Sequence, residues 1–341
     1  MNRFRNRWFA FVAFLLAGPL LVVATEVLTF LSGTNLVFIG FAALAATGLT
    51  LIMGFAGQVS LGHAAFYGVG AYTVALLTVK QGWAPFPAIL AGVGVCAVLA
   101  ALLGVAVLRI RGHFLAMATL AFGLIFFFYV RGAEYAGGNQ GIGGIPPLTI
   151  GGWDISGEDE STFLFTWALL ALGIVVAQNL VDSRTGRSLR ALGASEVAAS
   201  TSGIDVARAK VAVFVVGALY ASVAGSLYAM YVSYINPDAF GVLVSLQFLV
   251  ISTIGGLRSV WGAAAGAIFV VSLTELSREV VPLFFEEAAG SYEIVAYGIA
   301  LVVVLLALRQ GIVGGVRDLA ARLGPTAGRV GGEPETYDVS R

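Results

Sequence analysis

The chain has 341 residues, of which 59% are apolar and only 11% are charged, and its mean hydropathy is +0.93. Soluble domains carry about 25% charged residues, so this composition excludes a water-soluble globular protein. The formal net charge is zero, with 19 basic and 19 acidic residues, and gives no indication of a nucleic-acid partner. A single cysteine, Cys96, excludes an intramolecular disulfide.

Ten apolar runs are separated by polar gaps, and each is interpreted as a membrane span. The expected spans are 8–31, 36–53, 60–79, 87–108, 114–131, 163–181, 211–234, 242–257, 260–277 and 292–308. The sequence therefore predicts an all-α polytopic membrane bundle of about ten transmembrane helices, formed by residues 1–316. A disordered cytoplasmic tail is expected over 317–341, where glycine, proline and mixed charges predominate.

The basic residues are distributed unevenly between the two sides of this arrangement. With the N-terminus placed inside, 16 of them fall on the inner side, and only Lys80, Arg131 and Arg278 fall outside. Cytoplasmic loops of membrane proteins carry such an excess of lysine and arginine. Both termini are therefore expected in the cytoplasm.

Two segments combine small and polar residues where an inward span turns into an outward one, at 54–71 and 253–262. Broken backbone at membrane depth must be buried in protein or line a cavity, because lipid cannot satisfy its polar groups. The similarity of the two segments is compatible with two five-helix halves of the same orientation. The glycines expected to break helices or allow close packing are Gly57, Gly62, Gly255, Gly256, Gly262 and Gly266.

Four polar side chains in otherwise apolar spans are candidates for a translocation pathway: Gln58, Ser60, His63 and Gln247. His63 could line the pathway or could bridge a neighbouring helix, and all four could satisfy one another. With two histidines and one cysteine in the chain, no metal site is expected.

Two polar connections are long. The outer loop 132–162 is rich in glycine and acidic residues, and is expected either to be a solvated connector or to dock a partner. In the inner loop 182–210, the run from Arg184 to Leu192 predicts a short basic helix. Ser195 can cap a second helix, 196–202, that ends at Gly203. This loop could be anchored at lipid headgroups or could fit a cleft on a cytosolic protein.

Missing motifs narrow the mechanism. A phosphate-binding loop for ATP needs glycine before lysine, but Lys80 and Lys210 follow Val79 and Ala209. The chain is therefore not expected to bind ATP through this motif. The four carboxylates closest to the apolar runs fall at or near span ends, which weakens the case for an ion-coupled carrier. They are Glu26, Glu134, Glu275 and Glu293. No nucleophile stands with a base, so the chain is not expected to be an enzyme.

Several stretches together resemble the membrane permease subunits of branched-chain amino acid ABC importers. They are Gly48–Gly54, running into Gly57–Phe66, and Arg111–Leu120. Three further stretches, which begin at Gly137, Arg184 and Gly255, make the chain more similar to the M-type permease of such importers. The resemblance covers roughly residues 36–315, nearly all of the membrane part.

This resemblance implies a subunit, without a cofactor of its own, in a prokaryotic plasma (inner) membrane. Its implied partners are a second permease, two cytosolic ATPases and an external solute-binding protein. Leucine, isoleucine and valine are the default substrates. The residues that match the ATPase-coupling loop are Arg187, Glu196, Ala198, Ala199, Gly203 and Ile204. The sequence departs from the family pattern at 193–195 and 200–202, which leaves the identity of the ATPase open. The alternative is a stand-alone channel or ion-coupled carrier for a small polar solute such as urea or an amide.

Overall fold

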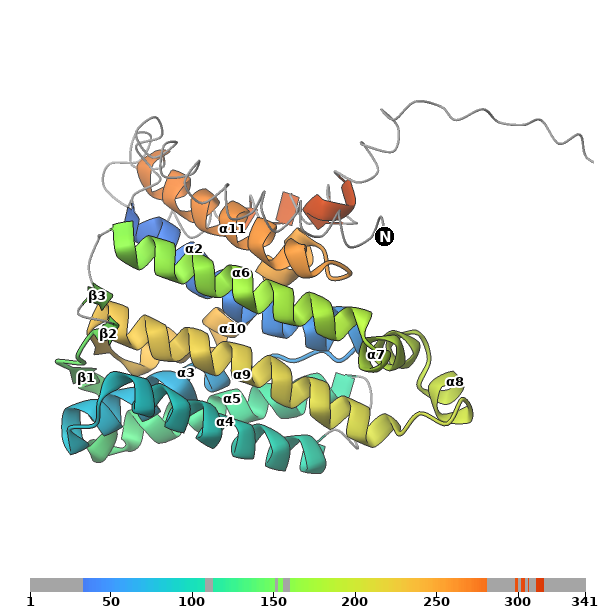
Figure 1. The fold of residues 1–341 in the computed structure, drawn as a ribbon, viewed down its shortest axis with the longest axis horizontal. Helices are drawn as coiled ribbons and strands as arrows, with labels where there is room; N and C mark the ends of the chain where they lie inside the picture. Colours follow the sequence, from blue (N-terminus) through green and yellow to red (C-terminus); the bar gives the residue numbers. More distant parts are fainter. Residues whose placement is uncertain are drawn as a thin grey trace, which may run out of the picture.

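The computed structural model describes residues 33–107, 113–150, 153–155 and 160–280, and the short pieces 298–299, 302–303, 306 and 311–315. The first expected span (8–31), most of the last one (292–308) and the expected tail (317–341) lie outside the described residues. The described part is predominantly helical, as expected for an all-α membrane bundle (Figure 1).

Six helices of the described part are long and apolar enough to cross a membrane. They are α2 (Gly33–Thr50) with the π-helical turn η1 (Leu51–Phe55), α4 (Pro85–Val107), α5 (His113–Gly132), α6 (Glu160–Asp182), α9 (Val206–Val232) and α11 (Val260–Val280). Each overlaps one of the expected spans, because a long apolar run can satisfy its backbone in lipid only as a helix.

Two other expected spans are shorter helices. α3 (His63–Ala75) continues through a π-helical turn, η2 (Leu76–Lys80), and α10 (Val242–Gly255) has 14 residues. About 20 helical residues are needed to cross the hydrocarbon, so α10 reaches only part of the way. The expected number of ten spans is therefore not confirmed by the residues that the structure describes.

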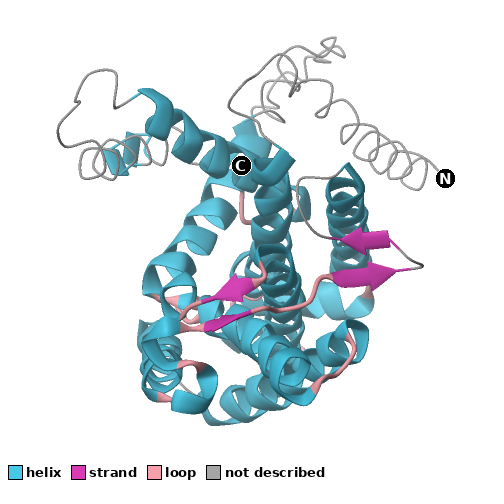
Figure 2. Ribbon diagram, turned by 90° about the vertical axis from the view of Figure 1, so that its left-hand side faces the viewer, coloured by secondary structure: helices cyan, strands magenta, loops and turns pink. Residues whose placement is uncertain are grey.

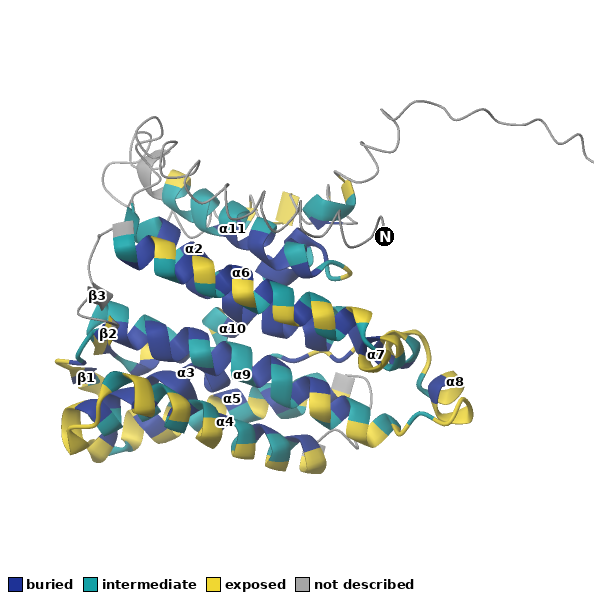
Figure 3. Ribbon diagram, in the orientation of Figure 1, coloured by how far each residue is buried: buried dark blue, intermediate teal, exposed yellow. Residues whose placement is uncertain are grey.

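The helices α2, α3 and α9 form the centre of the bundle. α9 packs against α2, α3 and α4, and α2 also packs against α6 and α11. Most side chains of α2 are buried, whereas α4 and α5 each expose a row of large apolar side chains. The exposed residues of α4 are yellow in Figure 3. A Cβ atom on Gly225 of α9 would lie 1.8 Å from the carbonyl oxygen of Tyr67 of α3. Small residues thus let the central helices approach closely, as in other membrane bundles.

One end of the bundle, which we call the strand end, carries two short antiparallel strand pairs (Figure 2). β1 (Ile142–Gly143) pairs with β4 (Tyr234–Ile235), and β2 (Leu148–Ile150) pairs with β3 (Trp153–Ile155). The turns η3 (Glu134–Ala136) and η4 (Gly138–Gln140) precede β1, and η5 (Pro237–Phe240) follows β4. The outer loop 132–162 thus contributes β1, β2 and β3 to these pairs.

The opposite end, which we call the elbow end, carries α7 (Arg184–Ala194) and α8 (Glu196–Thr201) (Figure 1). The hydroxyl oxygen of Ser183 accepts a hydrogen bond from the amide of Gly186 and caps α7. Ser195 caps α8 in the same way by accepting from the amide of Ala198 at 3.3 Å. Gly203 follows with φ of +80°, a conformation that favours glycine. The two short helices expected in the inner loop are confirmed.

Candidate functional site

A break in the helical chain separates α2 from α3. After η1 the backbone runs without regular structure through residues 56–62, and α3 begins at His63 inside the bundle. The hydroxyl of Ser245 on α10 accepts from the amide of Ala64 at 2.9 Å, and that of Thr119 on α5 accepts from the amide of Leu61 at 3.0 Å. Neighbouring helices thus satisfy backbone donors that the break exposes, as buried irregular backbone requires. The sequence predicted broken backbone over 54–71, but residues 63–71 lie in α3 and are helical.

Three of the four pathway candidates lie in or beside this break and form what we call the polar layer: Gln58, Ser60 and His63. Their exposed fractions are 3%, 1% and 0%. His63 donates from Nε2 to the carbonyl oxygen of Ala45 on α2 at 3.0 Å, so it does bridge a neighbouring helix. The side-chain amide of Gln58, the hydroxyl of Ser60 and Nδ1 of His63 have no hydrogen-bond partner among the described residues. Burial of an unpaired polar group costs about 1–3 kcal/mol, so this layer is a costly feature of the fold.

The fourth candidate, Gln247, lies in a different place. It lines a cavity of about 690 Å³, which we call the vestibule. Along α2 the lining runs from Thr34 to Ala42, which corresponds to a depth of about 12 Å at the helical rise. The vestibule is lined by Thr34, Asn35, Phe38, Phe41, Ala42, Tyr67, Tyr228, Ala239, Val244, Gln247, Phe248, Val271, Thr274 and Glu275. Its size is within the usual range of small-molecule sites.

A group of packed rings, which we call the aromatic floor, borders the vestibule. Tyr67, Tyr228 and Phe248 line the cavity, and Phe240 packs beside Tyr67. The ring of Tyr67 lies 5.5 Å from those of Tyr228 and Phe248 and 5.6 Å from that of Phe240, measured between centroids. Phe248 also meets the ring of His63 edge-on at 6.2 Å. The floor therefore connects the vestibule directly to the polar layer.

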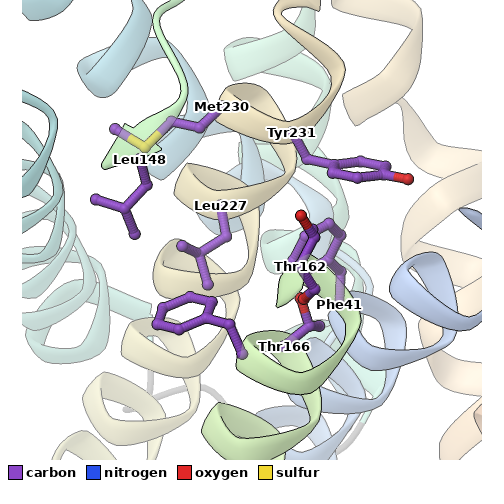
Figure 4. Close-up of a pocket in the computed structure, with 8 residues that line it drawn as sticks. Phe41, Leu148, Thr162, Thr166, Leu227, Met230 and Tyr231 are labelled. Atoms are coloured by element: carbon purple, nitrogen blue, oxygen red, sulfur yellow. The ribbon is translucent and has the colours of Figure 1, made fainter. Parts of the chain in front are cut away.

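A second hollow near the strand end is far too small for a solute. It lies between α2, α6 and α9, and its volume is about 10 Å³, room for a single water molecule at most. Figure 4 shows Phe41, Leu148, Leu227 and Met230 around it, with the hydroxyls of two threonines on α6. Thr166 donates to the carbonyl oxygen of Thr162 in its own helix at 2.8 Å. We do not include this hollow in the candidate pathway.

On the elbow side of the break, backbone meets backbone through glycines. A Cβ atom on Gly54 would lie 1.6 Å from the carbonyl oxygen of Leu257, in the second of the two segments that the sequence singled out. A Cβ atom on Gly193 of α7 would lie 2.7 Å from the carbonyl oxygen of Phe55. Gly57, with φ of +66°, faces Gly193 from the other side. The turn η1 therefore touches the α10–α11 turn, and η1 and the break together touch the end of α7.

The other glycines expected to allow close packing also lie against backbone. A Cβ atom on Gly62 would lie 2.0 Å from the carbonyl oxygen of Thr119. Gly255, Gly262 and Gly266 bring the end of α10 against the start of α11, and a Cβ atom on Gly255 would lie 1.8 Å from the carbonyl oxygen of Gly262. Gly256 adopts φ of +111° at the end of α10.

The elbow separates the candidate coupling residues into exposed and buried groups. Arg187, Ala198 and Gly203 are exposed, Glu196 and Ile204 are half-buried, and Ala199 is 1% exposed. The carboxylate of Glu196 forms an ion pair with the ammonium group of Lys210 on α9, whose side chain is only 4% exposed. Glu196 thus ties α8 to the base of α9, and Ala198 presents the outer side of α8 to solvent.

The described residues contain no group of three or more histidine, cysteine, aspartate and glutamate side chains that could hold a metal ion.

Comparison with known proteins identifies the family. Residues 31–308 match the family model described as "Branched-chain amino acid transport system / permease component". The chain belongs to this permease family. It is 34% identical over 258 residues to the high-affinity branched-chain amino acid transport system permease protein LivM of Salmonella typhimurium, and 33% identical to LivM of Escherichia coli. Both alignments cover 68% of this chain and 60% of the relative, so the match spans less than two thirds of LivM.

The permease protein LivH of Escherichia coli is more distant. It is 26% identical over 298 residues, and the alignment covers 80% of this chain and 91% of LivH. The higher identity to LivM agrees with the M-type resemblance of the sequence.

Several residues of the site escaped the sequence analysis. Gly193 was noted only as a departure from the family pattern, although it forms the contact between α7 and the break. Val197 of α8 is 67% exposed, which makes it the large apolar side chain that the elbow offers to solvent. Glu275 was set aside because it lies near a span end, but it lines the vestibule. The position of Glu275 within an apolar run was the signal that could have identified it.

Proposed function

We propose that this chain is the permease subunit of an ATP-driven importer of branched-chain or related amino acids, and that it forms part of the translocation pathway. The pathway runs from the vestibule through the aromatic floor and the polar layer to the elbow end. One observation carries the proposal. The floor residue Tyr67 stands on α3, which starts at the break, and the break is in backbone contact with Gly193 of the elbow. Movement of the elbow is thereby linked to the closure of the vestibule.

The distribution of charge supports an orientation with the elbow in the cytoplasm. Arg184, Arg187, Arg190, Arg208 and Lys210 lie in α7 and at the start of α9, at the elbow end. The strand end has fewer described basic residues, namely Lys80, Arg131 and Arg278. By the positive-inside rule the vestibule then faces outward, where a solute-binding protein delivers its ligand. The chain would lie in a prokaryotic plasma membrane with both termini cytoplasmic.

In this proposal the energy comes from other subunits. Of the two cytosolic ATPases, one would bind α7 and α8 of this chain through the exposed residues Arg187, Val197 and Ala198. Glu196, Ala199, Gly203 and Ile204 would shape the elbow and hold it to α9. A second permease would complete the pathway. ATP binding would then bias the bundle between two states of access, because partner binding energy can shift a two-state equilibrium. No covalent chemistry and no cofactor are assigned to this chain.

Reconstitution tests the proposal. We expect amino-acid uptake into proteoliposomes that contain this chain, its second permease and their ATPases, only when ATP and the external binding protein are present. A double variant, Glu196→Arg with Gly203→Pro, should abolish both stimulation of the ATPase and uptake. It reverses the charge that pairs with Lys210, and proline cannot adopt the φ of +80° found at Gly203. Unchanged stimulation and uptake in this variant would refute the coupling role.

The aromatic floor offers a second test. Phe248→Ala removes a ring from the floor next to Tyr67 and His63, so it should produce leakage of amino acid without ATP. If no amino acid leaks through this variant in the absence of ATP, the proposed translocation pathway is contradicted. Uptake of urea or an amide by this chain alone, in ATP-free proteoliposomes, would support the stand-alone channel or carrier instead.

A further inference from the structure

The vestibule contains a carboxylate that the proposed transport cycle does not yet use. Glu275 lies on α11, five residues before that helix ends at Val280, and its side chain is half-buried. Among the described residues that line the vestibule, it is the one that carries a charge at neutral pH. Charged side chains are costly within membrane helices and mark solute or ion pathways when they face a cavity.

The rest of the lining suits a molecule with both polar and apolar parts. Phe38, Phe41 and Phe248 supply apolar ring surface, and the rings also attract cations at their faces. The amide group of Gln247, on α10, can donate hydrogen bonds to a carboxylate. A negative charge, an amide donor and several rings around one cavity match a zwitterion with an apolar side chain.

We propose that the vestibule contains an ammonium-binding subsite, in which the carboxylate of Glu275 binds the amino group of the solute. The inference rests on the proposed function and deepens it. The permease then selects solutes itself, in addition to the external binding protein: it retains molecules with a protonated amino group and rejects apolar carboxylates that lack one.

Thiol labelling tests the subsite without transport. Val244 lines the vestibule, so Val244→Cys places a reporter there, in a Cys96→Ala background that removes the native buried thiol. The assembled permease complex is labelled with a trimethylammonium-bearing or a sulfonate-bearing methanethiosulfonate, and the ratio of the two rates is measured. Glu275→Gln should slow the cationic reagent and speed the anionic one about fivefold each, the effect of one unit charge at about 4 Å in water, so the ratio of the two rates should fall about 25-fold. Glu134→Gln, on the exposed turn η3, is the matched control and should leave the ratio unchanged.

Solute protection in the same assay defines the chemistry. L-leucine and isoamylamine should slow the labelling of Val244→Cys, and 4-methylvalerate, which lacks the amino group, should not. Glu275→Gln should remove the protection by both amines. Equal protection by 4-methylvalerate, or an unchanged rate ratio and unchanged protection in Glu275→Gln, would overturn the subsite.

Uptake kinetics provide a second measurement and separate the two proposals. In the reconstituted importer, Glu275→Gln should raise the KM for leucine at least fivefold, and Glu275→Asp should largely restore it. If the wild-type importer takes up leucine and Glu275→Gln has the wild-type KM, the subsite is wrong and the proposed function stands. If the wild-type importer shows no ATP-dependent uptake of amino acids, the proposed function itself is wrong, and the labelling ratio still reports on Glu275.

Discussion

The contact between the elbow and the break predicts that Gly193→Ala uncouples ATP hydrolysis from transport. Gly193 is the second-last residue of α7, and its φ is not positive, so alanine introduces no backbone strain there. Gly57, on the other side of the contact, has φ of +66°, and a substitution there would mix strain with crowding. Gly193→Ala is therefore the cleaner perturbation.

The magnitude follows from the distances. The added Cβ atom would lie 2.7 Å from the carbonyl oxygen of Phe55 and 3.4 Å from the amide nitrogen of Gly57. Both neighbours are backbone atoms, so the two segments must move apart. Overpacking of this kind costs about 1–3 kcal/mol, whereas alanine favours the helix over glycine by up to about 1 kcal/mol. The variant should therefore fold, but a coupling contact weakened by about 1–3 kcal/mol changes the linked equilibrium about 5- to 150-fold.

The assay is the ratio of amino acid taken up to ATP hydrolysed in the same proteoliposomes. In Gly193→Ala this ratio should fall at least fivefold while ATP hydrolysis continues, because in the proposed assembly the ATPase binds the exposed side of α8, which this substitution leaves unchanged. The matched control is Gly94→Ala on α4, where a Cβ atom would have no neighbour within 4 Å, and its ratio should equal that of the wild type. A wild-type ratio in an assembled Gly193→Ala complex would refute the mechanical link.

Three further changes probe the polar interactions of the fold. Glu196→Gln leaves the buried ammonium group of Lys210 without its ion pair and should lower the thermal unfolding midpoint of the complex. Removing one partner of a buried ion pair costs about 3–5 kcal/mol of stability. The cost should be smaller here because the side chain of Glu196 is 31% exposed. Ser245→Ala leaves the amide of Ala64 unpaired at the start of α3 and should cost about 1–3 kcal/mol of stability in the same measurement. Ser60→Ala should do the opposite: it should raise the unfolding midpoint and lower the rate of uptake.

Each change has a partner that isolates the effect. Arg208→Gln breaks the ion pair between Arg208, whose side chain is 90% exposed, and Asp205, whose side chain is 52% exposed. Loss of this exposed pair should cost at most about 1 kcal/mol of stability. Ser277→Ala removes a hydroxyl that donates only to its own helix, and Ser226→Ala removes a buried hydroxyl that is already paired with the carbonyl oxygen of Ser222. If Glu196→Gln costs no more than Arg208→Gln, or Ser245→Ala no more than Ser277→Ala, the corresponding interaction has no structural role. If Ser60→Ala and Ser226→Ala change the unfolding midpoint and the rate of uptake equally, the unpaired hydroxyl of the polar layer has no role that a paired buried hydroxyl lacks.

Features that depend on local sequence could be predicted. Apolar runs located the long helices, and Ser195 with Gly203 located α8, because caps act within one helical turn. The extent of the break could not be read in this way. Gly68 and Gly70 look like helix breakers in the sequence, but they lie within α3, where a Cβ atom would meet Phe126 and the carbonyl oxygen of Ser222. Composition does not separate a glycine that breaks a helix from one that lets a neighbour approach.

Features that depend on packing between distant residues were not visible. The aromatic floor joins Tyr67, Tyr228 and Phe248, which come from three helices, and nothing in any one run marks these rings out. The pairing of Ile142 with Ile235 involves strands of two residues, too short for an alternating pattern. Gln58, Ser60 and His63 were recognised as polar side chains in an apolar region, but whether they were paired required the structure.

The unpaired groups of the polar layer carry information about a second state. If the side-chain amide of Gln58 and the hydroxyl of Ser60 stayed buried and unpaired in every state, each group would cost about 1–3 kcal/mol of stability with no compensating hydrogen bond. If elbow movement parts the aromatic floor, water or solute can reach these groups, and that state then gains the hydrogen bonds that the closed state lacks. The layer would therefore lower the cost of opening by raising the free energy of the closed form. Replacement of Ser60 by alanine relieves the closed form and removes the gain on opening, which is why stability and uptake should change in opposite directions.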